Sequence, residues 1–392
     1  MLTSLGLRLG MRWDLYTTKE DLLMTCEYFG VCGSCNFHHL LYEEQLKHKQ
    51  HKMAELFAID AATITTVASQ PSHFRNRAEF RIFHTDEGAS YAMHTVKHSL
   101  LPIQSCQIVS PKIASTMPAL LALVNADKEL SHKLYAIEFL SAFGTDEMLI
   151  TLIYHHRVGD ELFEKCQQIG AQNAWSIVLR SKKQKRVVHK DYILDKLLIF
   201  DKPYFYYHQE TSFVQPNAGV NEKMIEFAKK NTVNLGGDLL ELYCGNGNFT
   251  IALSENFRQV LTTEVSKSSM ISLRKNIQKN NISNIEFARM SAEEIITALK
   301  KQREFTRLRN IDLDAYQFSC VLIDPPRSGL DDETRDFITT FQTIIYISCN
   351  PQSLHHDLQT LSQTHSISKH TLFDQFAYTE HTEMGVVLTK IA

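Results

Sequence analysis

Residues 239–249 of this 392-residue chain read Leu-Leu-Glu-Leu-Tyr-Cys-Gly-Asn-Gly-Asn-Phe. The apolar start predicts a buried strand, and Gly245 and Gly247 follow it directly. Glycine allows the backbone to turn tightly and to approach a ligand closely. The third glycine of the dinucleotide-binding pattern G-x-G-x-x-G is absent, which disfavours a nicotinamide cofactor. The stretch therefore predicts a strand, a ligand-binding turn and then a helix.

The chain beyond this turn alternates between short apolar runs and helical segments. We expect strands at 239–243, 259–263, 285–290, 318–323 and 344–347, a helix at 266–279, and two closing strands near 370–373 and 385–389. Such alternation is typical of a doubly wound, mainly parallel sheet that binds its ligand at the carboxyl ends of the strands. The expected fold class is α/β, with a Rossmann-like domain at 208–392.

The chain before this domain has a different pattern. Tyr42, Leu46, Met53 and Phe57 recur at near-helical spacing, which predicts an amphipathic helix. It lies in a helical segment, 38–69, that we expect to pack on the Rossmann-like domain. Short apolar runs between 74 and 186 predict a mixed α/β domain at 70–207, and residues 1–37 form a cysteine-rich segment.

Composition excludes a membrane-spanning protein. Apolar residues make up 44% of the chain, but no stretch approaches the roughly 18 continuous apolar residues of a membrane-spanning helix. The N-terminus contains Arg8 and Arg12 and lacks the long apolar core of a signal peptide. We therefore expect a cytoplasmic protein, and a reducing compartment argues against disulfide bonds among the eight cysteines.

Basic side chains are grouped although the net charge is about −3. The groups are Arg75, Arg77 and Arg81; Lys182, Lys183, Lys185, Arg186 and Lys190; and Lys300, Lys301, Arg303, Arg307 and Arg309. Groups of this kind can bind the phosphates of a nucleic acid. For any one group taken alone, a solvated surface is the commoner explanation.

Two acidic residues follow strands that neighbour the glycine turn. Glu264 ends the second predicted strand, where a carboxylate can hold both hydroxyls of an adenosine ribose. Taken alone, this residue could equally be an acid at the start of a surface helix. Asp324 follows the fourth strand, which must stop at Pro325 because proline lacks a backbone donor. Together with the glycines, these acids predict an S-adenosylmethionine site and hence a class I methyltransferase domain.

A cysteine follows the next strand. Most unplaced cysteines are buried structural residues. Cys349, however, comes at the carboxyl end of a strand beside the predicted cofactor site, which favours a nucleophile. A base should lie near such a thiol, and the acids near the C-terminus, between Asp374 and Glu383, are candidates.

Three further cysteines, Cys26, Cys32 and Cys35, cluster near the N-terminus. Their proximity favours a metal over free thiols. The x5/x2 spacing is too wide for a radical S-adenosylmethionine enzyme.

These motifs resemble the bacterial tRNA (uracil-5-)-methyltransferase family, which methylates the T-loop uridine of tRNA. The likeness extends from about residue 38 to the end of the chain. Its motifs are His-Phe-Arg-Asn-Arg-Ala-Glu-Phe-Arg at 73–81, Gln-Pro-Asn at 215–217, the glycine turn at 240–249, Arg-Glu-Phe at 303–305, the Asp-Pro-Pro-Arg segment at 324–330 and Ser-Cys-Asn-Pro at 348–351.

The resemblance implies a role for each matching residue. The cofactor-binding positions are Gln215, Tyr243, Asn248, Glu264 and Asp324. Cys349 matches the nucleophile and Glu383 the proton acceptor, while Arg75, Arg81 and Tyr135 are candidate RNA contacts. Ala377 stands where a proline is common in the family, which concerns the stiffness of a loop and not the chemistry.

A second resemblance concerns the cysteines. Cys26, Cys32 and Cys35 look like part of the iron–sulfur site of the related 23S rRNA uridine methyltransferases, in which Cys106 would supply the fourth ligand. Four thiolates suit a cluster or zinc, and the resemblance favours 4Fe-4S.

The implied function is methylation of carbon 5 of a uridine in RNA, at the T-loop uridine (position 54) of tRNA, by a monomer that binds the T-arm. Other RNAs that carry a T-loop are further candidate substrates. A 23S rRNA uracil-5-methyltransferase is the first alternative, and the cysteines favour it. A non-catalytic Fe-S RNA-binding module is the second, but it leaves the grouping of Cys349, Glu264 and Asp324 unexplained.

Overall fold

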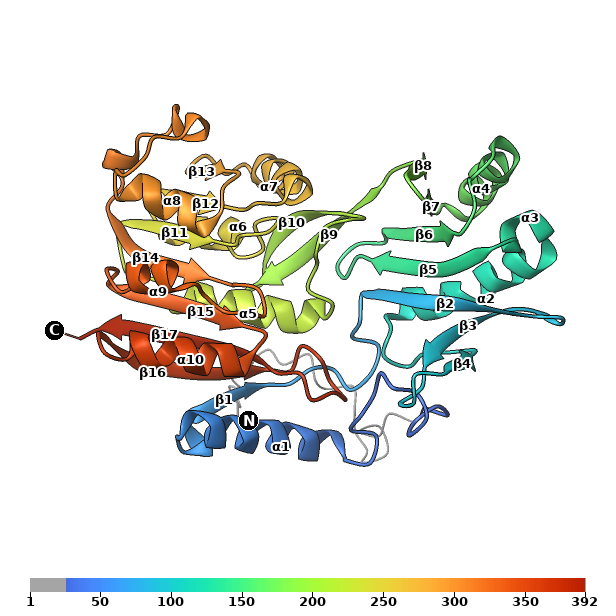
Figure 1. Cartoon of the computed structure of the whole chain (residues 1–392), viewed down its shortest axis with the longest axis horizontal. Coiled ribbons are helices and arrows are strands. Elements are labelled where there is room, and N and C mark those ends of the chain that lie inside the picture. Colours follow the sequence, from blue (N-terminus) through green and yellow to red (C-terminus); the bar gives the residue numbers. More distant parts are fainter. Residues whose placement is uncertain (1–25, 392) are drawn as a thin grey trace, which may run out of the picture.

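The structure is a computed structural model that describes residues 26–391. It contains an eight-stranded sheet and a seven-stranded sheet that lie side by side, with a two-stranded ribbon between them (Figure 1). Residues 1–25, which belong to the predicted cysteine-rich segment, lie outside the described range. None of the helices in the described range is long and apolar enough to cross a membrane.

The eight-stranded sheet has the strand order β1-β16-β17-β15-β14-β11-β12-β13. Its strands are β1 (Ile64–Val67), β11 (Asp238–Leu242), β12 (Val260–Thr263), β13 (Ile285–Ala288), β14 (Phe318–Ile323), β15 (Thr343–Ser348), β16 (His365–Phe373) and β17 (Glu383–Lys390). The strands from β13 to β15 are parallel, whereas β17 runs antiparallel to both β15 and β16. The doubly wound, mainly parallel sheet predicted from the alternating pattern is confirmed.

Helices cover both faces of this sheet. They are α1 (Tyr42–Phe57), α5 (Ala218–Lys230), α6 (Thr250–Leu253), α7 (Lys267–Lys279), α8 (Ala292–Leu299), α9 (Asp332–Ile338) and α10 (Pro351–Leu361), with 3₁₀ turns at Ala61–Thr63, Ser254–Asn256, Thr306–Leu308 and Leu313–Ala315. A separate apolar core fills each side of the sheet. Burial on both faces of β15 explains why residues 344–347 are continuously apolar and not alternating. Strand β11 is also fully buried, although it contains Asp238 and Glu241.

The seven-stranded sheet has the order β4-β3-β2-β5-β6-β7-β8. Its elements are β2 (Arg77–Thr85), β3 (Gly88–His94), β4 (Leu100–Ile103), α2 (Pro111–Ala126), α3 (Lys128–Ser131), β5 (Leu134–Ser141), β6 (Met148–Tyr154), α4 (Asp160–Asn173), β7 (Ser176–Ser181) and β8 (Gln184–Val188). Strands β6 and β7 are parallel because α4 connects them, and the other pairs are antiparallel. The predicted mixed α/β architecture is present.

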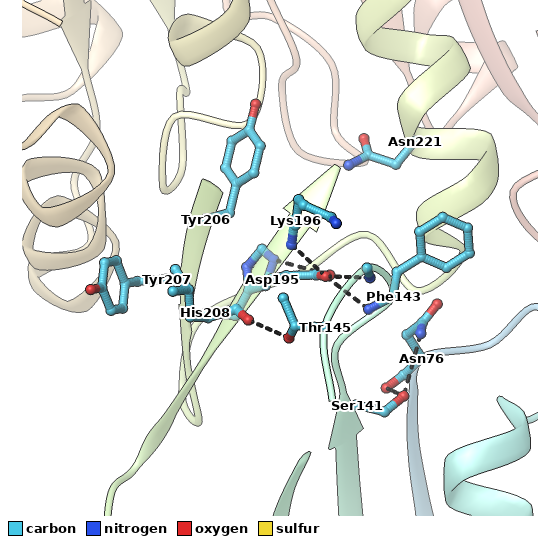
Figure 2. Close-up of polar contacts among 12 residues, drawn as sticks. Asn76, Ser141, Phe143, Thr145, Asp195, Lys196, Tyr206, Tyr207, His208 and Asn221 are labelled. Carbon is cyan, nitrogen blue, oxygen red and sulfur yellow. Dashed lines mark hydrogen bonds and ion pairs between the residues drawn. The ribbon is translucent and has the colours of Figure 1, made fainter. Parts of the chain in front are cut away.

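The ribbon formed by β9 (Tyr192–Ile199) and β10 (Lys202–Gln209) links the two sheets. Asp195 accepts hydrogen bonds from the backbone nitrogens of Phe143 (2.8 Å) and Gly144 (2.9 Å), as Figure 2 shows. Thr145 Oγ1 donates to the carbonyl of Leu194 at 2.7 Å. These bonds fasten the ribbon to the loop between β5 and β6.

A second connection joins the sheets directly. The backbone nitrogen of Asn76 donates to the carbonyl of Pro216 (2.7 Å), just before α5. The side chain of Asn76 donates to Ser141 Oγ at the end of β5. The end of β5 that carries Ser141 is therefore the end nearer the eight-stranded sheet.

Candidate active site

The turn between β11 and α6 has the conformation that its glycines predict. Gly245 has φ 57° and Gly247 has φ 87°, which favour glycine. A Cβ at Gly247 would lie 2.5 Å from Leu273 Cδ1, so this glycine allows α7 to pack against the turn. A Cβ at Gly245 would meet no atom within 4 Å. The turn is thus tightly packed behind Gly247 and open at Gly245, where a ligand can approach the backbone.

Glu264 lies beside this turn, directly after β12. Its carboxylate accepts hydrogen bonds from the backbone nitrogens of Gly245 (3.0 Å) and Ser266 (2.7 Å). A carboxylate oxygen has more than one lone pair, so both oxygens can still accept from a ligand hydroxyl. The residues fit an adenosine ribose.

The other candidate cofactor residues lie around the same strand ends. Tyr243, in the turn itself, is half-buried with φ 61°, and burial raises its pKa to about 12. Asn248 exchanges two amide hydrogen bonds with Asn221 of α5 (2.8 and 2.9 Å), a partner that no sequence signal indicated. Gln215 is buried just before α5.

Cys349 and Glu383 are brought together by strand pairing. Ser348, the last residue of β15, pairs with Met384 of β17, so Cys349 and Glu383 are neighbours at one edge of the sheet. Cys349 is half-buried. In the same part of the chain Cys244 and Cys320 are buried, and burial raises the pKa of both thiols.

The electrostatics of this edge favour uncharged groups. Burial raises the pKa of Cys349 to about 11, with further contributions from Glu383 and Asp324, while Arg327 lowers it. Burial also raises the pKa of Asp324 to about 7. The pKa of Glu383 is raised well above its ordinary value by burial and then by Asp324, and Arg327 again opposes the shift. One oxygen of Glu383 is buried without a hydrogen-bond partner in the described chain.

Glu383 follows a loop, residues 374–381, that α1 holds in place. Lys49 of α1 pairs with Asp374 Oδ1 at 2.6 Å and donates to the carbonyls of Phe376 (3.0 Å) and His381 (2.9 Å). Tyr42 Oη donates to the other oxygen of Asp374 at 2.7 Å. The helix predicted from apolar spacing therefore also makes buried polar contacts with the loop that precedes Glu383.

A model of the tRNA (Uracil-5-)-methyltransferase family matches residues 41–391. The chain belongs to this family. It is 47% identical over 374 residues to a tRNA/tmRNA (uracil-C(5))-methyltransferase from Aliarcobacter butzleri, with 94% of this chain and all of the relative covered. It is 46% identical to a protein of the same description from Nitratiruptor, with the same coverage.

A solved structure has the same fold. It is a tRNA (uracil-54, C5)-methyltransferase from Pyrococcus abyssi in complex with S-adenosyl-L-homocysteine, with a TM-score of 0.73 and 20% identity. The match covers 92% of this chain and 86% of that chain. At this identity, the likeness supports the fold of the family.

In this family member, the four cysteines predicted to bind a metal line one cavity. Cys26, Cys32, Cys35 and Cys106 face a space of about 410 Å³ that also borders Arg327 and the loop at 374–381. Burial and, to a smaller extent, the other three thiols raise the pKa of Cys35 to about 12. Across residues 26–391, however, no group of three or more histidine, cysteine, aspartate or glutamate side chains is arranged to hold a metal ion. The predicted metal site is not confirmed.

The candidate RNA contacts are divided between two places. The guanidinium of Arg81 lies 3.8 Å from the ring centroid of Tyr135, and that ring stacks on His155 at 3.9 Å. His155 was missed, because one histidine after a strand carries no motif. Arg75 lies instead at the cysteine cavity, where burial lowers its pKa and Cys106 and Cys35 oppose the shift. Its role in RNA binding stays a prediction.

Proposed function

We propose that this chain methylates carbon 5 of a uridine in RNA, with the T-loop uridine (position 54) of tRNA as its target. The observation that carries the proposal is the pairing of Ser348 with Met384, which makes Cys349 and Glu383 neighbours. Asp324 follows the adjacent strand β14 and acts on the pKa of both groups. A nucleophile and a base are the two groups that substitution at carbon 5 requires.

The residues act in two stages. Carbon 5 of uracil is a poor nucleophile, so the thiolate of Cys349 adds to carbon 6 and forms an enolate that is nucleophilic at carbon 5. S-adenosylmethionine, when bound, supplies an electrophilic methyl group. Glu383 then removes the proton from carbon 5, and the bond between carbon 6 and the thiolate breaks. The target base must leave its stack to reach the site.

The cofactor residues support this chemistry through their positions. Gln215, Tyr243, Asn248 and Glu264 would hold the cofactor around the open side of Gly245. Asp324 lies between this group and Cys349 in the strand order, since β14 neighbours both β11 and β15. The reacting carbon and the cofactor would thus meet at the carboxyl ends of adjacent strands.

The thiol must lose its proton before it attacks. With a pKa of about 11, Cys349 is mostly protonated at neutral pH. Arg327 is the positive group that favours its thiolate, and it does the same for the carboxylate of Glu383. Arg327 therefore supports both stages of the reaction through its charge.

The names of the relatives support tRNA as the substrate. The bacterial relatives are named for tRNA and tmRNA, and the Pyrococcus abyssi protein for uracil 54 of tRNA. An isolated T-arm stem-loop with S-adenosylmethionine should yield 5-methyluridine, measured by mass spectrometry of digested RNA. The control T-arm has cytidine at the target position. Methylation of 23S rRNA fragments with no reaction of the T-arm would contradict the tRNA assignment.

We also infer a 4Fe-4S cluster at Cys26, Cys32, Cys35 and Cys106. The inference is supported by their common cavity. Four thiolates are the ligand set that a 4Fe-4S cluster takes, and these four cysteines would hold it. Protein purified without oxygen should be brown and contain about four irons per chain. Colourless protein with one zinc would contradict the cluster and leave the methyltransferase proposal intact.

A further inference from the structure

A second cavity lies at the end of the seven-stranded sheet, where β6 and β7 both finish. It is an open hollow of about 710 Å³ between the loop after β6 and the turn between β7 and β8. The loop contributes His155, His156 and Arg157, and the turn contributes Lys182 and Lys183. No carboxylate lines it.

The charge at this cavity is not neutralised by neighbouring side chains. The same stretch of sequence contains three other basic residues, but Lys185 pairs with Asp191, Arg186 with Asp160 and Lys190 with Glu147. In contrast, Arg157, Lys182 and Lys183 have no ion-pair partner within residues 26–391. Lys182 and Lys183 are thus the unpaired lysines of their basic group, and together with Arg157 they can bind an external anion.

The two sides of the cavity are fixed to each other. Gln184 accepts a hydrogen bond from the backbone nitrogen of Val158 (2.9 Å) and donates to its carbonyl (3.0 Å). Ser181 Oγ donates to the same Gln184 oxygen at 2.9 Å, and Arg186 donates to the carbonyl of Gly159 at 2.9 Å. The backbone segments that carry Arg157, Lys182 and Lys183 are therefore held together before any ligand binds, which reduces the ordering that binding would require.

The cavity adjoins an aromatic surface. His155 lines the cavity and also stacks on Tyr135, whose other contact is Arg81. Cationic side chains interleaved with aromatic rings are typical of surfaces that bind nucleic-acid strands. Here His155 is exposed and Tyr135 is half-buried. A site for a free anion such as phosphate would not need the adjoining rings.

The cavity lies at the end of the seven-stranded sheet that is remote from the eight-stranded sheet. Leu134, at the start of β5, pairs with Tyr154, at the end of β6, so Tyr135 and His155 lie at the same end. Ser141, at the other end of β5, contacts Asn76 near the catalytic sheet. Eight residues of strand span roughly 25 Å. Figure 1 shows the seven-stranded sheet extending away from the eight-stranded one. RNA bound here is therefore not the target nucleotide.

We propose that this cavity binds the phosphodiester backbone of the substrate RNA outside its target loop, with Arg157, Lys182 and Lys183 contacting phosphates. The proposal rests on the proposed function, because it takes RNA as the ligand. Its contribution is electrostatic and independent of sequence, since phosphates carry no base identity.

The test compares two double variants of the full chain. Lys182→Gln/Lys183→Gln removes two charges at the cavity, and Lys230→Gln/Lys369→Gln removes two exposed charges from the other domain, where neither lysine has an ion-pair partner in the described chain. Binding of full-length tRNA is measured by fluorescence anisotropy at several salt concentrations, and methylation is measured in parallel.

In the cavity variant, the loss of two phosphate contacts should make the plot of log affinity against log salt concentration less steep, with the magnitude of its slope reduced by about 2. The KM for tRNA should rise severalfold for the cavity variant, with kcat and cofactor binding unchanged. The control should behave as wild type. Equal slopes and KM values for the two double variants would overturn the inference. Because anisotropy needs no turnover, tRNA that binds without being methylated would count against the proposed function and not against this site.

Discussion

Replacing Lys49 by methionine tests whether α1 positions the loop at 374–381. Lys49 and Asp374 are each 1% exposed at the side chain. Methionine keeps the aliphatic stem but leaves the Asp374 carboxylate buried without its cation. Removal of one partner from a buried pair costs about 3–5 kcal/mol. We therefore expect the free energy of unfolding to fall by that amount in urea denaturation followed by circular dichroism.

A matched control lies one turn along the same helix. Lys52 pairs with Glu380 of the same loop, but these side chains are 42% and 52% exposed. An exposed pair contributes about 0–1 kcal/mol. Lys52→Met should thus leave stability nearly unchanged, and Lys49→Met/Asp374→Asn should recover part of the loss because no unpaired charge remains.

The same variants report on function. The loop leads directly to Glu383, so Lys49→Met should lower kcat more than it raises the KM for tRNA. The reasoning would be refuted if the free energy of unfolding of Lys49→Met lay within 1 kcal/mol of the wild-type value and equalled that of Lys52→Met.

Three other predictions concern the site. Arg327→Gln removes the positive charge that lowers the pKa of Cys349 and of Glu383. Less thiolate then forms at a given pH, so the rising limb of the pH–rate profile should move to higher pH by up to about one unit. A rising limb at the same pH as in wild type would contradict this role of Arg327. Glu264→Gln should weaken binding of S-adenosylhomocysteine at least tenfold in calorimetry while RNA binding is kept. Gly247→Ala should destabilise the protein by about 1–3 kcal/mol, because the left-handed backbone and the contact with Leu273 both oppose a Cβ; an unchanged melting temperature would argue against this packing.

Local patterns of apolar residues predicted most strands of the eight-stranded sheet. The expected strand at 318–323 matches β14, and the expected helix at 266–279 matches α7 to within one residue. These segments are strongly apolar or amphipathic, so periodicity alone defines them. The start of the last strand was placed at 385, whereas β17 begins at Glu383.

Long-range pairing was beyond the sequence. Residues 64–67 form β1, which lies parallel to β16 some three hundred residues later, and nothing in their local pattern indicates this partner. The antiparallel insertion of β17 between β15 and β16 likewise sets Glu383 beside Cys349. From residues alone, Glu383 was one of several acids, and the resemblance to the family singled it out.

The sequence also could not predict which basic side chains form ion pairs. The basic residues from 182 to 190 form one group in the sequence. Three of them pair with Asp191, Asp160 and Glu147, and two of these acids lie far from the group in the sequence. Only the three-dimensional contacts therefore distinguish the paired basic residues from the unpaired lysines. Arg75 shares a motif with Arg81, yet its side chain lies at the cysteine cavity.

The central claim is that Cys349 forms a covalent bond to the RNA before Glu383 removes a proton, and trapping that bond tests it most directly. Wild type, Cys349→Ala and Glu383→Gln are each incubated with S-adenosylmethionine and a T-arm, either normal or with 5-fluorouridine at the target, and resolved on denaturing gels. Wild type should form a shifted protein–RNA band with the fluorinated T-arm, because fluorine does not leave as a proton does. Glu383→Gln should accumulate the band with normal RNA, because the methylated adduct has lost its proton acceptor. Cys349→Ala should bind RNA and give no band; a band or turnover from Cys349→Ala would contradict the account.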